Sequence, residues 1–193
     1  MLLGSRTVLR AVELADYPLI ARWLNDPAVM KFWGRAGDTL SVADVSDVES
    51  AERVRGNSRK YIIDTLDGRS IGQIDYYDLN WQSRSAWTSI LVADTDYWGG
   101  GYGTEAMRTL LHYLFAQMGL HRVCLTVHES NVRAQRSYAK NGFVKEGLLR
   151  DWAYFDGRWE NGVLMAVLAP EFETAVASTS ESTHSSTSAN KSL

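Results

Sequence analysis

The segment Tyr97-Trp98-Gly99-Gly100-Gly101-Tyr102-Gly103-Thr104-Glu105-Ala106 places four glycines directly before the clearest helical pattern of the chain. Glycine has no Cβ, so its backbone N–H groups can approach a ligand closely. The N-terminus of the following helix adds N–H groups without intrahelical partners and the positive end of the helix dipole. This combination predicts a loop that binds the pyrophosphate of a nucleotide-containing ligand.

The spacing of these glycines excludes two common nucleotide-binding loops. No Lys-Ser or Lys-Thr pair follows the last glycine, as a P-loop requires. No βαβ unit with a trailing acid surrounds the glycines, as in dinucleotide-binding domains. A flexible glycine-rich turn is the alternative interpretation, so the loop alone predicts a phosphate site without identifying the nucleotide.

Strand and helix patterns alternate along the rest of the chain, which predicts a mixed α/β fold with about seven strands and about four helices. Strands are expected at residues 7–13, 61–63, 71–76, 86–92, 123–127, 143–155 and 159–168. Helices are expected between residues 16 and 25, and at 41–55, 104–118 and 131–140. Ser41 or Thr39 is a suitable cap for the second helix.

Length and composition favour one domain over residues 1–170, because the chain has 193 residues of which 45% are hydrophobic. The net charge of -3 without a basic stripe argues against nucleic acid as a partner. The apolar runs are too short to span a membrane and the N-terminus does not resemble a signal peptide, so a cytoplasmic location is expected. Residues 171–193 are rich in Ser and Thr and are expected to form a disordered tail.

Cysteine and histidine give little sign of metal or redox chemistry. Cys124 lies in an apolar run and is expected to be buried and inert. The histidines lack metal-ligand spacing, so no metal is expected.

Residues 98–103 resemble the (Gln/Arg)-x-x-Gly-x-Gly/Ala signature of the GNAT superfamily of N-acetyltransferases, with Trp98 in the Gln/Arg position. The wider segment is similar to the branch of RimJ/RimL-type protein acetyltransferases and spermidine acetyltransferases. A second block, residues 131–143, resembles that family's Asn-x-x-Ala-x-x-x-Tyr-x-Lys-x-Gly-Phe. The resemblance covers about residues 7–168 and implies a single GNAT-like domain with a splayed sheet, acetyl-CoA as co-substrate and a homodimer as a common assembly.

The resemblance also implies which residues contact acetyl-CoA. Backbone N–H groups near Leu91 or Val92 would polarise the thioester carbonyl. Asn131 would contact the cofactor, and Tyr138, two helical turns later, would reach its sulfur as a general acid. A tyrosine that only fills the core is the alternative for Tyr138. The pyrophosphate would lie against residues of the glycine loop (residues 98–104): Trp98, Gly99, Gly100, Gly101, Tyr102, Gly103 and Thr104.

The basic residues of the second block, Arg133, Arg136 and Lys140, fall on a different face of the predicted helix from Asn131 and Tyr138. A solvated face is the favoured interpretation for these side chains. Contact with cofactor phosphates is the alternative.

The general base is less evident from the sequence. Relatives often carry a Glu early in the strand before the loop, but Trp87 occupies that position here. Asp75 is the preferred candidate, with Asp78 and Glu129 as weaker ones. An ordinary surface carboxylate is the alternative for each, because a water chain or capture of neutral amine would need no dedicated base.

The acceptor is expected to meet aromatic and acidic side chains, which together can bind a cation. Trp33, Tyr76 and Trp87 are the predicted acceptor contacts. Other candidate aromatics are Trp23, Phe32, Tyr77, Trp81, Trp152, Tyr154 and Trp159. The acids are Asp38, Asp44, Asp47, Glu49 and Glu52.

These side chains favour an amine-bearing small molecule such as a polyamine or an aminoglycoside-like compound. The segment around Trp23 and Trp33 is also similar to aminoglycoside 6'-acetyltransferases. Acids that complement a helix dipole and aromatics that fill a core are the alternative. A peptide N-terminus as acceptor, or a non-catalytic acyl-CoA-binding module, stays open.

Overall fold

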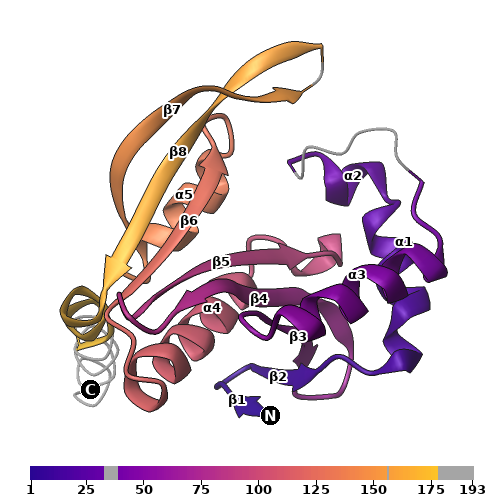
Figure 1. Cartoon of the computed structure of the whole chain (residues 1–193), viewed down its shortest axis with the longest axis horizontal. Helices are drawn as coiled ribbons and strands as arrows, with labels where there is room; N and C mark the ends of the chain where they lie inside the picture. Colours follow the sequence, from indigo (N-terminus) through magenta and orange to yellow (C-terminus); the bar gives the residue numbers. More distant parts are fainter. Residues whose placement is uncertain (33–38, 156, 178–193) are drawn as a thin grey trace, which may run out of the picture.

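The computed structural model of this chain describes residues 1–32, 39–155 and 157–177. Within them, eight strands form one mixed sheet in the order β1-β2-β3-β4-β5-β6-β8-β7 (Figure 1). This confirms the predicted mixed α/β class. Trp33 and Asp38, two of the predicted acceptor-site residues, lie outside the described residues.

The first five strands form an antiparallel half of the sheet. They are β1 (Leu2–Leu3), β2 (Thr7–Ala11), β3 (Arg59–Thr65), β4 (Ser70–Asn80) and β5 (Ser85–Val92). The two-residue strand β1 is the one that the sequence pattern did not predict. It is too short to show the alternation on which strand prediction depends.

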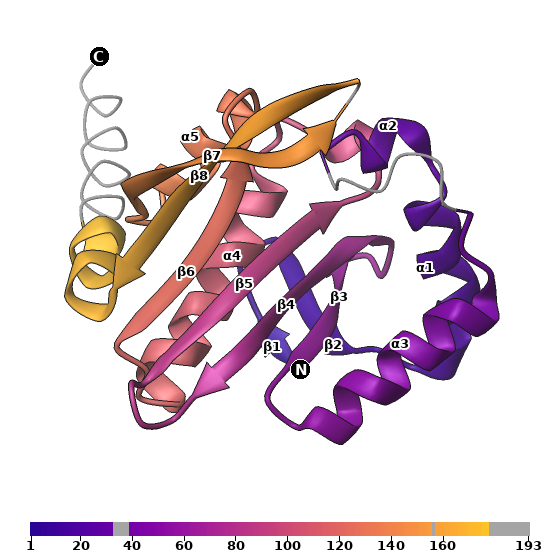
Figure 2. The same cartoon turned by 45° about the horizontal axis from the view of Figure 1, so that its top comes forward.

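The second half of the sheet contains β6 (Arg122–His128), β7 (Val144–Phe155) and β8 (Arg158–Leu168). β6 pairs in parallel with β5 from its first residue, and this pairing ends at Trp87 and Cys124 although both strands continue. The two halves of the sheet therefore splay apart after Trp87. Figure 2 shows β5 and β6 diverging.

Helices cover both faces of the antiparallel half. α1 (Tyr17–Leu24), α2 (Pro27–Met30) and α3 (Val42–Arg55) lie on one side, and α4 (Tyr102–His112) lies on the other (Figure 2). α5 (Val132–Ala139) contacts α4. Every helix in the described part of the chain is too short or too polar to cross a bilayer.

Two apolar clusters correspond to these two faces. The larger one joins Met107, Leu110 and Leu111 of α4 to the sheet, and the smaller one joins Ile20 and Trp23 of α1. All five side chains are almost inaccessible to solvent. Burial of this apolar surface is the main force that holds the helices on the sheet.

The strand β4 shows how side chains divide between the two faces. Ile74 and Tyr76 belong to the larger cluster with α4. Because successive strand residues point to opposite faces, Gln73, Asp75 and Tyr77 face the α1–α3 side.

The ends of the two longest predicted helices follow local chemistry. Ser41 caps α3: its hydroxyl accepts from the Asp44 N–H at 3.1 Å, and the Asp44 carboxylate accepts from the Ser41 N–H at 2.7 Å. Gly56, with φ of 68°, ends α3 as a left-handed cap. α4 continues through a π-helical turn at Tyr113–Gln117 and stops at Gly119, whose φ is 67°.

The disordered tail was predicted to begin at residue 171, which is too early in the chain. Residues 169–177 are helical, so the prediction for 171–177 was wrong. Phe172 is 4% exposed and packs in the larger cluster, with Val176 against it. These apolar residues give the segment a surface to bury, which the Ser/Thr-rich composition around them concealed.

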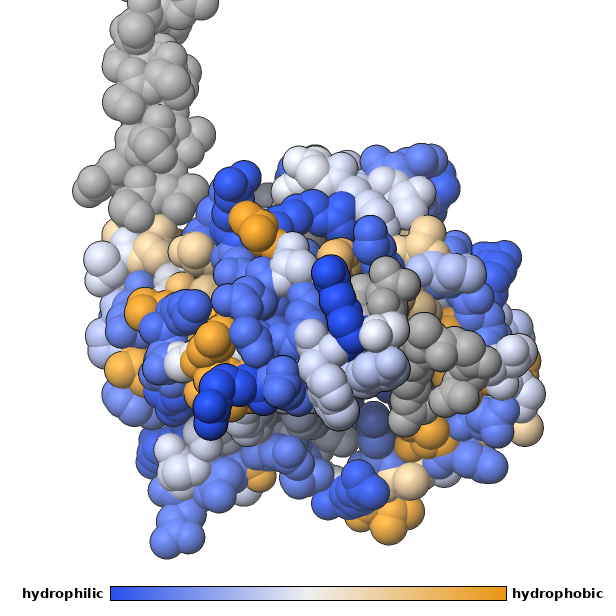
Figure 3. Space-filling view, turned by 90° about the horizontal axis from the view of Figure 1, so that it is seen from above, coloured by the Kyte–Doolittle hydropathy of each residue, from blue (hydrophilic) through white to orange (hydrophobic). Residues whose placement is uncertain are grey.

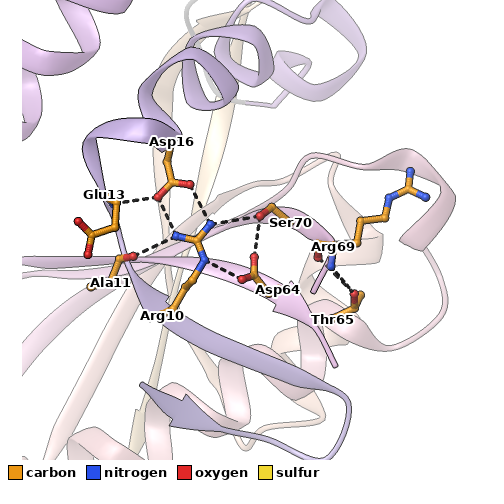
Figure 4. Close-up of polar contacts among 8 residues, drawn as sticks. All are labelled: Arg10, Ala11, Glu13, Asp16, Asp64, Thr65, Arg69 and Ser70. Carbon is orange, nitrogen blue, oxygen red and sulfur yellow. Dashed lines mark hydrogen bonds and ion pairs between the residues drawn. The ribbon is translucent and has the colours of Figure 1, made fainter. Parts of the chain in front are cut away.

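An ionic network attaches the start of α1 to the sheet edge (Figure 4). Arg10 donates from both terminal nitrogens to Asp16 at 2.7 and 2.8 Å, and from Nε to Asp64 at 2.7 Å. Ser70 donates its hydroxyl to Asp64 at 2.7 Å. The hydrogen bond from Arg10 holds the pKa of Asp16 below its usual range. Because Arg10 links Asp16, at the start of α1, to Asp64 of β3, the network fixes the position at which α1 begins.

Candidate functional site

A cavity of about 1390 Å³ runs across the molecule through the gap between β5 and β6. Residues of α1, α2, α3, β3, β4, β5, β6, β7, α5 and the glycine loop line it. Figure 3 looks from the end that carries the β7–β8 hairpin and α2, where hydrophilic side chains predominate between small apolar patches. The volume exceeds the roughly 300–1,000 Å³ of most small-molecule sites, so two substrates can be held together.

The glycine loop forms one wall of this cavity. Gly99, Gly101 and Gly103 line it together with Thr104. Gly101 precedes α4 with φ of 86° and has no side chain to cap the helix. The first N–H groups of α4 are therefore available to an anionic ligand, as the sequence predicts.

Two residues of the predicted loop site lie away from the cavity wall. The Gly100 carbonyl accepts a hydrogen bond from Arg6 at 2.6 Å. The Arg6 guanidinium also lies 4.1 Å above the ring of Tyr102, which contacts Tyr97 edge to face. The Gly100 carbonyl and the Tyr102 ring thus support the loop from its outer side, and contact of these two residues with the cofactor stays a prediction.

Trp98 joins the loop to the splayed strand and to α5. Its indole N–H donates to the Val92 carbonyl at 2.7 Å. The Arg133 guanidinium lies 4.0 Å over the Trp98 ring, a cation–π contact. Arg133, Arg136 and Lys140 are exposed, as expected, but they also line the cavity, so this end of it is basic.

Leu91 and Val92 lie where β5 has left β6, and both line the cavity. Along a strand, alternate N–H groups point to opposite edges, so part of this backbone faces the gap rather than β4. Gly72 permits a close approach from β4, because a Cβ at this position would lie 2.0 Å from the Leu91 carbonyl oxygen.

The helix α5 brings Asn131 and Tyr138 to the cavity, as predicted. Asn131 is the N-cap of α5, and its side chain accepts from the Ala134 N–H at 3.1 Å. The hydroxyls of Ser137 and Thr104 are 2.7 Å apart, which couples α5 to the glycine loop.

Tyr138 of α5 lines the cavity, and the centre of its ring lies 5.7 Å from that of Phe143. Burial raises the pKa of Tyr138 to about 12, and the nearby Tyr77 and Asp75 add to this effect. The phenol therefore keeps its proton at neutral pH and can donate it.

Asp75 occupies the sheet face opposite this helix. Ser89 donates to one Asp75 carboxylate oxygen from its N–H at 3.0 Å and from its hydroxyl at 2.7 Å. Burial nevertheless raises the pKa of Asp75 to about 6, against the opposing effects of Ser89 and of the Lys60 charge. Such a carboxylate is ionised at neutral pH, and its pKa is near enough to neutral pH for it to accept a proton.

The cavity is acidic at the end formed by α3 and β4. The acids that line it there are Asp44, Glu49, Glu52, Asp75 and Asp78. One cation lies among them: the Lys60 ammonium is ion-paired with Glu49 and lies 3.7 Å from Glu52. Burial lowers the pKa of Lys60, but the combined effects of Glu49, Glu52 and Asp75 outweigh burial, so the pKa lies above its ordinary value.

The predicted acceptor aromatics divide between the cavity and other places. Trp87 lines the cavity, but Tyr76 lies in the core with α4. The prediction for Tyr76 was wrong because the sequence alone does not fix which face of β4 is buried, and its neighbour Tyr77 faces the cavity instead. Phe32 and Trp152 also line it.

Other candidates lie elsewhere. Trp23 is buried in the smaller core cluster. Glu129 accepts from Asn161 at 2.9 Å rather than facing the cavity. More than half of the residue surface is exposed at Trp81, Tyr154 and Trp159, with values of 62%, 61% and 61%.

Lys60, His128 and Gln73 are among the cavity residues that the sequence did not predict. His128 Nδ1 is 3.0 Å from the Glu160 carboxylate, and both side chains are buried. The Gln73 side-chain oxygen is buried without a hydrogen-bond partner among the described residues. The His128–Glu160 contact joins residues 32 positions apart, and the places of Lys60 and Gln73 depend on strand register, so only hydrophobic alternation could have pointed to these positions.

The acetyl-CoA predicted from the sequence fits the residues present. Its phosphates match the glycine loop and the basic side chains of α5. The gap between β5 and β6 lies between the loop and the acidic end. Across residues 1–32, 39–155 and 157–177, no group of three His, Cys, Asp or Glu side chains is placed to hold a metal ion.

Comparison with known proteins agrees with this site. A family model described as an acetyltransferase (GNAT) domain matches residues 6–144. The chain is 25% identical to spermidine N(1)-acetyltransferase of Vibrio cholerae over 171 residues, 88% of this chain and 97% of that protein. It is 27% identical to aminoglycoside N(6')-acetyltransferase type 1 of Klebsiella pneumoniae over 154 residues, 75% of this chain and 77% of that protein.

Solved structures show the same fold. The Vibrio cholerae spermidine N-acetyltransferase in complex with CoA and spermine superposes with a TM-score of 0.81 at 24% identity, covering 88% of this chain and 99% of that one. Mycobacterium smegmatis RimJ in complex with CoA-disulfide superposes with a TM-score of 0.76 at 27% identity, covering 86% and 83%. The chain therefore belongs to the GNAT acetyltransferase family and is an acetyl-CoA-dependent N-acetyltransferase.

Proposed function

We propose that this enzyme acetylates a primary amine on a cationic small molecule, of the polyamine or aminoglycoside class. The separation of charge along one cavity carries the proposal. Arg133, Arg136 and Lys140 lie at the end beside the glycine loop, whereas five carboxylates lie at the α3–β4 end. An anionic donor and a cationic acceptor are each attracted to a different end.

Similar proteins support this acceptor class. The Vibrio cholerae relative is a spermidine acetyltransferase, and the Klebsiella pneumoniae relative acetylates an aminoglycoside amine. Both names describe amines on polycationic small molecules. Acids lining the cavity of this chain offer the same kind of attraction.

Asp75 is the proposed general base. An alkylammonium with a pKa near ~10.4 must lose a proton before its nitrogen can attack. Above about pH 6 the Asp75 carboxylate is ionised and can take that proton. Ser89 holds the carboxylate by two hydrogen bonds, which fixes its direction toward the bound amine.

Tyr138 is the proposed general acid on the other side of the cavity. Acetyl-CoA supplies the acetyl group as an activated thioester. With a pKa of about 12, the Tyr138 phenol holds a proton that it can give to the departing sulfur. Backbone N–H groups of the β5 segment that contains Leu91 and Val92 can polarise the carbonyl.

A peptide N-terminus is the second candidate acceptor, supported by the likeness to RimJ. An α-amine has a pKa of about 7.7–8.0, so a larger fraction of it is neutral at pH 7 and its acetylation depends less on a general base than that of an alkylamine. The two candidates therefore differ in how strongly turnover depends on Asp75 and on salt.

The test is a turnover screen of the wild-type enzyme with acetyl-CoA. The acceptors are polyamines, aminoglycosides, monoamines and short peptides, each at low and high salt. Small cationic amines are expected to give the highest kcat/KM, with a loss at high salt because screening weakens their attraction. Preference for peptides, without salt dependence, would replace this proposal with the second candidate.

A further inference from the structure

Lys60 places an ammonium group among the carboxylates at the acidic end of the cavity. Its side chain is 11% exposed, and its ammonium is ion-paired with Glu49, whose side chain is 7% exposed. Glu52, 35% exposed, lies 3.7 Å from the same ammonium. Glu49 and Glu52 both line the cavity, so an amine of this chain already neutralises part of the acidic end.

The strand register places this amine beside the proposed base. Lys60 and Asp75 are directly opposite on β3 and β4, and Asp75 is opposite Ser89 on β5. Directly opposed residues of antiparallel strands point to the same face. Lys60, Asp75 and Ser89 therefore form a row across the sheet, with Glu49 and Glu52 of α3 beyond Lys60.

Binding of an acceptor's ammonium group to these carboxylates together with Lys60 would be unfavourable in free energy. Two like charges beside one buried carboxylate repel, and a covalently attached amine has an effective concentration of the order of millimolar or more. Displaced from Glu49, Lys60 would also leave one buried charge unpaired. The pocket thus resists any acceptor that extends a second cation past Asp75.

We propose that Lys60 is a specificity-determining residue that occupies the Glu49–Glu52 pocket and makes the enzyme disfavour acceptors whose second ammonium group would bind there. The inference rests on the proposed acceptor class and narrows it. Acceptors with one ammonium, or with further charges directed to Asp44 and Asp78 at other parts of the cavity, are used best.

The experiment compares primary monoamines with α,ω-diamines of equal chain length. Wild type, Lys60→Met and Lys60→Arg are assayed for kcat/KM at low salt. In Lys60→Met the diamine-to-monoamine ratio rises at least about tenfold at the chain length that reaches Glu49, mainly through KM, because the pocket is free for a cation. Lys60→Arg keeps the wild-type ratio.

The ratio separates competition from an effect on Asp75. Loss of the Lys60 charge beside Asp75 would change the rate with both acceptors alike, so it cancels in the ratio. In the double variant Glu49→Gln, Lys60→Met, the ratio returns toward the wild-type value because the carboxylate is gone. A ratio within about twofold of wild type in Lys60→Met, which is close to ordinary kinetic error, overturns the inference.

The affinity of the enzyme for diamines and monoamines can be measured without turnover and with more than one Lys60 variant. Lys60→Gln is the second variant should Lys60→Met fail to fold, as judged by thermal unfolding. Calorimetry is expected to show tighter diamine binding to the variant than to wild type by about tenfold, with monoamine binding unchanged. Equal diamine affinity overturns the inference, whereas absence of amine turnover in wild type overturns only the proposed function.

Discussion

Ser89 donates two hydrogen bonds to the same carboxylate oxygen of Asp75, from its N–H at 3.0 Å and from its hydroxyl at 2.7 Å. The two residues face each other across the β4–β5 pair, at the point where β5 leaves β6. The sheet therefore supplies both the gap that we assign to the donor and the carboxylate that we propose as the general base.

Asp75→Asn should reduce activity while stabilising the fold. The amide cannot accept the amine proton, so kcat/KM is expected to fall about 10²–10⁴-fold. The folded-state pKa of Asp75 is raised to about 6, so its ionisation costs stability as pH rises from its unfolded pKa of about 4 to about 6 and above. At neutral pH the variant should be more stable by about 1–2 kcal/mol, because partial exposure reduces the full effect.

Steady-state kinetics and thermal unfolding measure both effects. Wild-type kcat/KM should decrease about tenfold per pH unit below about pH 6, and the variant should lack this limb. Glu129→Gln is the matched control, because Glu129 is bonded to Asn161 away from the cavity. Unchanged activity in Asp75→Asn would remove Asp75 from the mechanism.

Tyr138→Phe should lower kcat about 10–10²-fold with little change in the KM for acetyl-CoA, since only the hydroxyl is lost. With a pKa of about 12, the phenol stays protonated up to about pH 10, so it contributes no alkaline loss of activity below that pH. The exposed Tyr154→Phe serves as control. A wild-type kcat in Tyr138→Phe would show that another group or solvent protonates the thiolate.

Arg133→Met should weaken acetyl-CoA binding. The guanidinium, 4.0 Å over the Trp98 ring, is held beside the glycine loop. Its loss is expected to raise the KM for acetyl-CoA about 5–20-fold and to make that KM less sensitive to salt. The matched control is Arg150→Met, an exposed arginine on β7, and an equal effect of both substitutions would contradict a specific role for Arg133.

Gln73→Met tests the buried amide that faces the cavity. Its side-chain oxygen lacks a partner among the described residues, so a methionine of similar volume should stabilise the enzyme by about 1–2 kcal/mol. The substitution would also remove any hydrogen bond that a substrate N–H donates to this oxygen, and this loss is expected to raise KM about 5–10-fold. Denaturant unfolding and substrate KM values measure the two effects, and a loss of stability with unchanged KM would contradict both.

Arg10→Met should destabilise the entry of α1. The substitution leaves Asp16 and Asp64 without their cation, which is expected to cost about 2–4 kcal/mol in the free energy of unfolding at neutral pH. The pKa of Asp16 is depressed in the fold, so this contribution is present above its unfolded pKa of about 4 and is lost as pH falls further. The difference from wild type should therefore shrink in acid, whereas the exposed Arg22→Met should have little effect at any pH.

Most of the predicted donor-side residues line one cavity in the structure, and they could be predicted because their signals are local. The glycine loop and the Asn131–Tyr138 spacing each lie within one short segment, so periodicity and turn chemistry are sufficient. The acceptor side depends on strand register instead. Lys60, Asp75 and Ser89 meet only because three strands align, and a one-residue shift reverses the face of each side chain.

The same physical reason explains the remaining misses. Tyr76 and Tyr77 are equally plausible as acceptor contacts until the buried face of β4 is known. His128 and Glu160 are 32 residues apart, and antiparallel pairing of β6 with β8 brings them together. No local pattern records such contacts.

Acetyl transfer to a cationic acceptor is tested most directly by identifying the product that the wild-type enzyme forms from acetyl-CoA and a small cationic amine. Mass spectrometry should detect the amine carrying one acetyl group on its primary nitrogen, in equal amount to the CoA thiol released. The rate should decline at high salt and below about pH 6. Binding of acetyl-CoA without acetylation of any cationic amine in the panel would contradict the proposed function.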